Sequence, residues 1–153
     1  MTAPAALLTT YLMSFEVEVG QAMSIDQSAP GRRFIPILGG SVSGRLTGRI
    51  CEGGGDWQTV SADGSIELEA HYIVDINGHG LVEVRSTGLR SASPEVAQAV
   101  SRGEEVDPRR VYFRTMMRFR TQANDLTWLN TRLCLSTGRR EASRVRLDIH
   151  ELA

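Results

Sequence analysis

The chain has 153 residues and a mass of 16.8 kDa, a length typical of a single domain that folds without disulfides or metals. Its net charge of −1 and pI near 6.3 give no basic surface of the kind that binds nucleic acid or an anionic membrane. All 17 basic residues are arginine, and the absence of lysine excludes Schiff-base chemistry, pyridoxal phosphate attachment and a phosphate-loop lysine.

The N-terminus and the two cysteines indicate a cytoplasmic protein. Residues 1–8 have no basic region and too short an apolar run for a secretory signal, and nothing downstream approaches the roughly 18 apolar residues of a membrane span. Cys51 and Cys134 are far apart and have no partners spaced for a zinc motif. We therefore expect two reduced, mostly buried thiols and no structural metal.

The first part of the chain predicts antiparallel strands interrupted by glycine. The expected strands are residues 7–18, 21–25, 34–38 and 45–51, with a loop at 28–33. Phe15 and Val17 alternate with Glu16 and Glu18, which is typical of a strand with one buried face. Glycine inside such strands favours bulges and bends that curl a sheet into a barrel, although a close approach of backbone to a ligand is the alternative.

The centre of the chain predicts a hairpin and then the only helix. Expected strands at residues 66–74 and 81–89 flank Asn77-Gly78, a strong signal for a two-residue turn. Ser93 can cap a helix over residues 94–102 that ends at Gly103. This helix is too short for a crossover between parallel strands, so we expect it to plug or flank a barrel.

The last part of the chain predicts three more strands. They are residues 110–121, 128–137 and 145–149, separated by turns at 122–125 and 138–140. Nine or ten strands and one short helix predict an all-β fold, a closed antiparallel β-barrel that forms a single domain over residues 1–153.

The strand at 110–121 concentrates guanidinium groups on one face. At a period of two, that face holds Tyr112, Arg114, Met116, Arg118 and Arg120. An unpaired buried charge costs several kcal/mol, so the face must meet water, a polar cavity or carboxylates. Either Arg114 and Arg118 point inward with Tyr112 to bind a ligand oxygen, or they pair with Glu67, Glu69 or Glu83 across strands. We predict the inward orientation.

A second candidate group surrounds Asp56. A carboxyl held against the indole of Trp57 can have its pKa raised toward a value useful for a general acid or base. The alternative is a loop aspartate that accepts backbone hydrogen bonds while Trp57 covers the barrel mouth. We predict that the catalytic residues are Asp56, Arg114 and Tyr112. The predicted ligand-binding residues are Trp57, Glu69, His71, Arg90, Arg118, Trp128 and Asn130.

Several motifs in order resemble those of a known family. They are Gly53 to Gln58, Asp63-Gly64, Tyr72, Gly88 to Arg90, Tyr112 to Thr115 with Phe119, Trp128 to Asn130 and Thr137 to Arg140. With these motifs, nearly the whole chain resembles the domain of unknown function 3237, also called uncharacterised protein family 0311. The resemblance implies a closed antiparallel barrel similar to the allene oxide cyclase-like and lipocalin-like barrels, in a family with no established general activity. The chain departs from the family pattern at Gly55, His71, Met117 and Arg120, the last of which reverses a charge.

The expected function is binding of a small molecule inside the barrel. The first hypothesis is an isomerase, cyclase or lyase that acts without a cofactor on an organic acid or polyketide-like compound. The alternatives are a non-catalytic carrier barrel and a protein-interaction module. Spacing brings no histidine to a carboxylate, so we predict no metal site. The expected partner is a small-molecule ligand rather than nucleic acid or membrane, and a homodimer is the default expectation.

Overall fold

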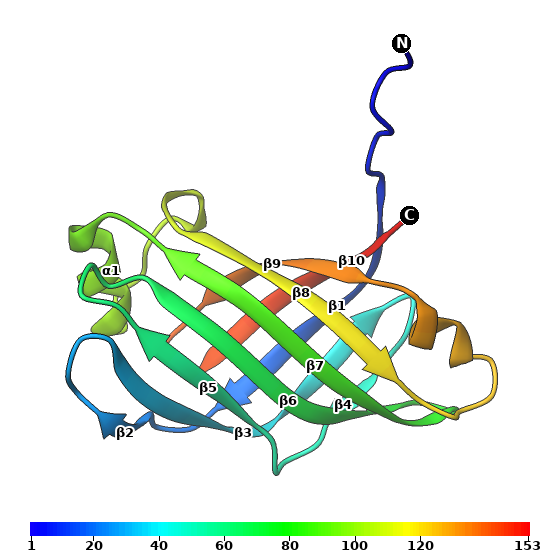
Figure 1. The fold of residues 1–153 in the computed structure, drawn as a ribbon. Helices are drawn as coiled ribbons and strands as arrows, with labels where there is room; N and C mark the ends of the chain where they lie inside the picture. The colour runs from blue at the N-terminus through cyan, green and yellow to red at the C-terminus, as the bar shows by residue number, and fades with distance from the viewer.

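The computed structural model describes residues 1–153 as an antiparallel β-barrel with one α-helix at one end (Figure 1). The strands are β1 (Thr9–Val19), β2 (Met23–Asp26), β3 (Gly31–Gly44), β4 (Gly48–Ile50), β5 (Gly55–Val60), β6 (Ile66–Ile76), β7 (Gly80–Ser91), β8 (Tyr112–Arg120), β9 (Cys134–Arg140) and β10 (Arg144–Leu152). The helices are α1 (Pro94–Ser101) and the short 3-10 helices η1 (Pro108–Arg110) and η2 (Thr127–Thr131).

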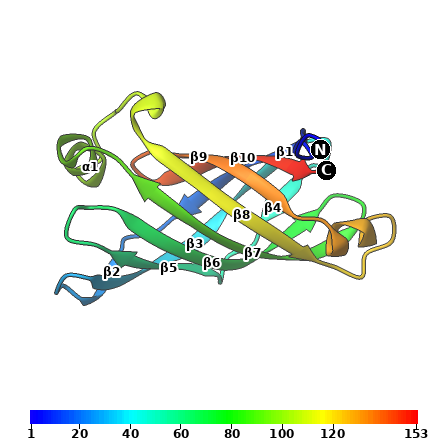
Figure 2. The same cartoon turned by 45° about the horizontal axis from the view of Figure 1, so that its top comes forward.

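The sheet closes on itself. Its order is β1-β10-β9-β8-β7-β6-β4-β3-β2, and β1 also pairs with β3. β4 and β5 occupy successive parts of one position between β3 and β6, while β2 continues along β3 beyond the end of β1. The result is a closed eight-stranded antiparallel barrel with one helix, which confirms the predicted closed antiparallel barrel with one short helix. Figure 2 shows α1 and η2 at opposite ends of it.

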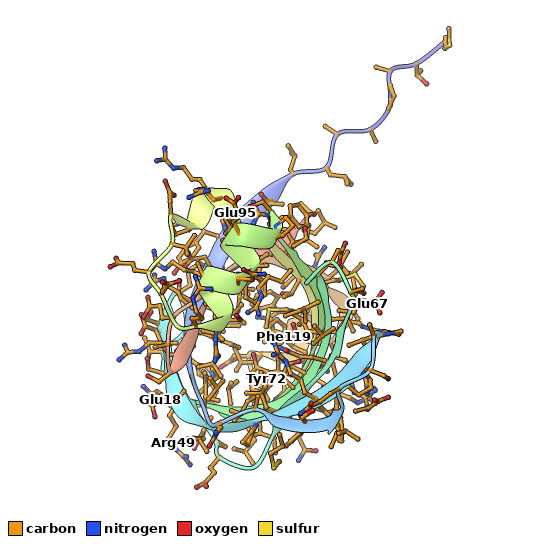
Figure 3. All side chains as sticks on the ribbon, turned by 90° about the vertical axis from the view of Figure 1, so that its left-hand side faces the viewer. Glu18, Arg49, Glu67, Tyr72, Glu95 and Phe119 are labelled. Atoms are coloured by element: carbon orange, nitrogen blue, oxygen red, sulfur yellow. The ribbon has the colours of Figure 1, made fainter.

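Alternation along the strands decides which side chains fill the barrel. In β6, every second residue from Ile66 to Ile76 is buried, and the intervening residues are exposed or half-buried. Figure 3, viewed from the α1 end, shows Tyr72 and Phe119 inside the barrel, while Glu18 and Glu67 lie on its outside. Apolar burial on the inner face and charge on the outer face therefore fix the register of the sheet.

The two halves of the interior are filled differently. Toward η2, large side chains pack completely, and among them are Phe15, Met117, Leu126, Leu129 and Ile149. Toward α1, several inward positions carry small residues, namely Ala70, Ser86, Gly88, Thr115 and Gly138. Small side chains cannot fill the diameter of an eight-stranded barrel, so the α1 half keeps a cavity.

The glycine-rich region bends β3 without ending it. Gly40 has a φ of 141°, which side chains rarely adopt, and a Cβ there would overlap the carbonyl of Glu16 on β1. The sequence predicts a break here, with a separate strand at 45–51, but β3 continues from Gly31 to Gly44. Glycine thus lets one long strand serve β1 on one side and both β4 and β5 on the other.

Replacing Gly40 by alanine is expected to lower the free energy of unfolding by about 2 kcal/mol, because it combines backbone strain with a clash. Gly53 is the matched control, since its φ is 118° but a Cβ there would meet nothing within 4 Å. Gly53→Ala should cost only the strain, about 1 kcal/mol. Urea unfolding of both variants measures the difference. Equal losses would show that the contact with β1 contributes nothing.

Four other sequence expectations are wrong. The predicted loop at 28–33 contains the start of β3, and the glycine cluster leads directly into β5, which the sequence does not predict as a strand. Residues 128–131 lie in η2 instead of a strand, because this segment closes the far end of the barrel with Leu129. The predicted turn at 138–140 is the end of β9.

The helix prediction is confirmed. α1 begins at Pro94 after Ser93, whose hydroxyl accepts a hydrogen bond from the backbone nitrogen of Val96, and Gly103 follows with a φ of 76°. Both cysteines are free, and burial raises the pKa of the Cys134 thiol to about 11. None of the helices has the length and hydropathy that crossing a membrane requires.

Candidate functional site

A cavity of about 170 Å³ occupies the α1 half of the barrel. Apolar walls come from strands around the barrel and include Ile35, Leu68, Phe113 and Leu147, while Val100 of α1 borders the cavity as well. An apolar cavity of about 150 Å³ is large enough for benzene, so this one can accommodate a small organic molecule. The polar groups among these walls determine what chemistry it can support.

One polar chain links three of the wall residues. Arg33 Nε donates to Gln58 Oε1 at 2.7 Å, and Gln58 Nε2 donates to Asp56 Oδ2 at 2.7 Å. Because an arginine nitrogen can only donate, the amide of Gln58 must present its oxygen to Arg33 and its nitrogen to Asp56. Oδ2 of Asp56 therefore acts as an acceptor, and a proton on this carboxyl would sit on Oδ1.

Asp56 Oδ1 and the Tyr72 hydroxyl are both buried and have no hydrogen-bond partner within the protein. Burial raises the pKa of Asp56, although the hydrogen bond from Gln58, the nearby backbone amide of Glu69 and the charges of Arg90 and Arg33 oppose the rise. Burial also raises the pKa of Tyr72, and the Asp56 carboxylate adds to this effect. Two unpaired buried polar atoms at one cavity are unusual and indicate a place for polar groups of a ligand.

Three arginines contribute to the same cavity. Arg33, Arg90 and Arg140 line it from β3, β7 and β9. Burial and the neighbouring guanidinium groups of Arg33 and Arg140 lower the pKa of Arg90 to about 10, so it remains charged at neutral pH. Burial also lowers the pKa of Arg33 and of Arg140. None of the ion pairs of the protein involves Arg33, Arg90 or Arg140.

Gln58 offers a direct test of the electrostatics. In Gln58→Leu the pKa of Asp56 should rise further, because the lost hydrogen bond is the largest of the influences that lower it. Carbon-detected NMR titration of the Asp56 carboxyl measures the shift, with the exposed Gln122→Leu as a control. An unchanged pKa in Gln58→Leu would mean that the amide does not hold the carboxylate.

The inward orientation predicted for the arginine face of β8 is wrong. Tyr112, Arg114 and Arg118 are exposed on the outer surface, whereas Phe113, Thr115, Met117 and Phe119 point inward. The apolar face points inward because it completes the buried core with the neighbouring strands. Arg114 lies over the Tyr112 ring at 5.2 Å and donates to the Phe113 carbonyl. Neither Arg114 nor Arg118 forms the ion pairs with Glu67, Glu69 or Glu83 that were the alternative, since Glu83 pairs with His71 and Arg85.

Three more predicted ligand residues also lie outside the barrel. Trp57 is 43% exposed and packs against Phe34, with ring centroids 4.7 Å apart. It pairs across the sheet with Glu69, which is exposed as well. His71 is exposed and contacts Glu83 at 2.6 Å. Trp57 neither supports the Asp56 carboxyl nor covers the barrel mouth, because successive residues of β5 point to opposite faces.

The predicted residues Trp128 and Asn130 belong to the opposite end. Trp128 lies on η2 and packs against the core there. The amide of Asn130 both accepts from and donates to the backbone of Thr121, so it fastens η2 to the end of β8. Of the sequence-predicted site residues, only Asp56 and Arg90 line the cavity.

Four of the residues that give the cavity its polar chemistry were not predicted as site residues. They are Arg33, Gln58, Tyr72 and Arg140. Tyr72 could have been found, because it shares the apolar face of its strand with Leu68 and Val74 and is the only member with a hydroxyl. Arg33 and Arg140 could not, since both were placed in turns. The structure contains no group of three or more His, Cys, Asp or Glu side chains that could hold a metal ion.

The fold and the site define a closed β-barrel whose interior is packed at one end and forms a polar cavity at the other. The chain belongs to the family described as protein of unknown function (DUF3237), whose model matches residues 8–152. The resemblance noted in the sequence is therefore confirmed. A UPF0311 protein of Bradyrhizobium diazoefficiens is 35% identical over 145 residues, which cover 94% of this chain and 95% of the relative. A UPF0311 protein of Rhodopseudomonas palustris is 36% identical over 95% of this chain and 97% of its own length.

Solved structures show the same fold. A conserved protein of unknown function from Rhodopseudomonas palustris matches with a TM-score of 0.92 at 35% identity, covering 99% of this chain and 100% of that one. A beta-barrel like protein from Acinetobacter baumannii matches with a TM-score of 0.84 at 28% identity, and both chains are covered completely. An enzyme from Penicillium herquei matches with a TM-score of 0.72 at 20% identity over 100% of this chain and 99% of that one, a likeness of fold alone.

Proposed function

We propose that the protein binds a small enolisable organic compound, an organic acid or polyketide-like molecule, in the α1 half of the barrel and catalyses a proton transfer on it without a cofactor. The observation that carries this proposal is the pair of buried atoms without protein partners, Asp56 Oδ1 and the Tyr72 hydroxyl, at one cavity with apolar walls. An acid–base group and a hydrogen-bond donor at one small pocket are the parts that such a reaction needs.

The roles follow from the two environments. The raised pKa makes Asp56 a stronger base than an exposed aspartate, so Oδ1 can accept a proton from a carbon next to a carbonyl. Tyr72 keeps its proton because its pKa is raised, and its hydroxyl can donate to the enolate oxygen that forms. Return of the proton at another carbon gives an isomerase, ring closure gives a cyclase, and departure of a leaving group gives a lyase.

Exchange of substrate protons with solvent tests the proposal. Panels of 2-oxo and 3-oxo carboxylic acids are incubated with the protein in D2O, and deuterium at the carbon next to the carbonyl is followed by NMR. The wild-type protein should accelerate exchange of at least one compound. Tyr72→Phe should lose roughly 10²–10³-fold, the effect of removing one donor to an oxyanion.

Tyr112→Phe is the matched control, since that hydroxyl lies on the outer surface and its loss should leave exchange unchanged. Binding without exchange across the panel would contradict the enzyme and favour the carrier alternative. Mass spectrometry of small molecules that copurify with the protein narrows the panel of compounds to test.

The cytoplasmic location and the homodimer stay predictions.

A further inference from the structure

The arginines of the cavity carry more positive charge than the protein neutralises. Arg33, Arg90 and Arg140 come from three different strands, yet they lie close enough together that the charge of Arg33 lowers the pKa of both Arg90 and Arg140. Asp56 is the only acidic residue among the cavity walls. Three guanidinium groups and at most one carboxylate leave an excess of positive charge in a partly buried place, where it is costly unless an anion joins it.

Most hydrogen-bond donors of these three guanidinium groups have no acceptor within the protein. Arg33 donates a hydrogen bond from Nε to Gln58, and its terminal nitrogens make no hydrogen bond within the protein. Arg140 makes a single long contact of 3.5 Å with the carbonyl of Ala142. Arg90 lies over the Phe113 ring at 6.0 Å and donates no hydrogen bond to a protein oxygen. Most of the donors of the three groups therefore remain available to an oxyanion.

The arginines and Tyr72 lie at different depths in the barrel, and this difference determines how a ligand that contacts both must be oriented. Arg90 and Arg140 stand at the ends of β7 and β9 nearest α1, whereas Tyr72 lies deeper in the barrel, level with Val84 of β7. The apolar walls between these two levels include Leu68 and Phe113. A ligand that satisfies both levels needs an anionic group at one end and an apolar body that reaches inward from it.

We propose that Arg33, Arg90 and Arg140 form a subsite for the carboxylate of an organic acid, which holds the acid by its charged end and directs its apolar body toward Asp56 and Tyr72. The guanidinium groups match a carboxylate because their paired donors bind its two oxygens together. The inference rests on the proposed function only in placing the ligand in this cavity. It requires no reaction there.

Benzoate and benzamide test the subsite, because they have nearly the same shape and differ in charge. Titration followed by protein NMR should show benzoate binding in the cavity at least 10-fold more tightly than benzamide. Arg90→Met and Arg140→Met should each weaken benzoate at least 10-fold and leave benzamide unchanged. Arg114→Met is the matched control, since that arginine is exposed on the outer surface and its loss should change neither.

Equal affinity for the two probes, or full benzoate affinity in Arg90→Met and Arg140→Met, would overturn the subsite. Inorganic phosphate should compete poorly because it cannot use the apolar walls, and displacement of benzoate by equimolar phosphate would overturn the assignment to an organic acid. Melting of each variant without probe shows that it is folded. Asp56→Asn separates the two proposals, since it should keep benzoate binding and lose proton exchange. Exchange that survives in Asp56→Asn would refute the proposed chemistry and leave the subsite standing.

Discussion

Asp56→Asn should lower proton exchange at the substrate by about 10²–10⁴-fold, the range of a general base. Asparagine keeps the shape of the side chain and can still accept from Gln58, but it cannot take up a proton. Exchange rates in D2O under saturating and limiting compound measure the loss. A variant with wild-type exchange would show that another group carries the proton.

The same substitution should make the protein more stable at neutral pH, by roughly 1 kcal/mol or 2–4 °C in melting temperature. The pKa of Asp56 is raised in the folded state, so the folded carboxyl holds its proton at pH values where the unfolded one has lost it. Wild-type stability therefore falls as pH rises from the ordinary aspartate pKa of 3.8 through the raised value. Asparagine does not ionise, so the stability of the variant lacks this pH dependence.

The stability gap between Asp56→Asn and the wild type should therefore shrink as pH falls toward 4. Urea unfolding at several pH values between 4 and 8 measures it. A gap that widens at lower pH would mean that the carboxylate is stabilised in the folded state, and the assignment of Asp56 as a buried base would fail.

Phe15→Ala is expected to cause the largest loss of stability, about 3–5 kcal/mol. Phe15 is completely buried in the packed half, and its ring meets Tyr72 and Phe119 edge to face at centroid distances of 6.2 and 6.5 Å. Such a loss is a large share of the ~5–15 kcal/mol that stabilises a typical domain, and it should lower the melting temperature by roughly 10 °C.

Tyr112→Ala is the control for this substitution, because its aromatic side chain is 55% exposed on the same barrel and its loss should change stability by only about 0.5 kcal/mol. Thermal melting and urea unfolding of both variants give the comparison. A loss below about 1 kcal/mol for Phe15→Ala would show that the packed half collapses around the gap.

The closed barrel, the short helix and most strands could be predicted because each depends on local alternation or on a cap. The direction of β8 could not. A period of two divides Arg114 from Phe113, but it does not say which of the two faces is inside. The neighbouring strands decide, since Phe113 and Met117 complete a core that the arginines could not.

The sequence predicted correctly only those site residues that occupy inward positions on their strands. Asp56 and Arg90 lie at inward positions, so both line the cavity. Trp57 follows Asp56 directly in β5, and two successive strand residues cannot both face inward. Arg33 and Arg140 join the site through pairings with distant strands, which the order of residues in one chain does not reveal.

The unequal filling of the two barrel halves has a consequence for divergence and redesign. The packed half provides most of the stability, so the walls of the α1 half can change shape without unfolding the protein. Enlarging Ala70 or Ser86 would shorten the space for a ligand body, and trimming Leu68 would lengthen it, while Phe15 and Ile149 hold the barrel closed. Under the proposed function, such changes would adapt one scaffold to a range of organic acids, with the arginines as the fixed end of a chamber of variable depth.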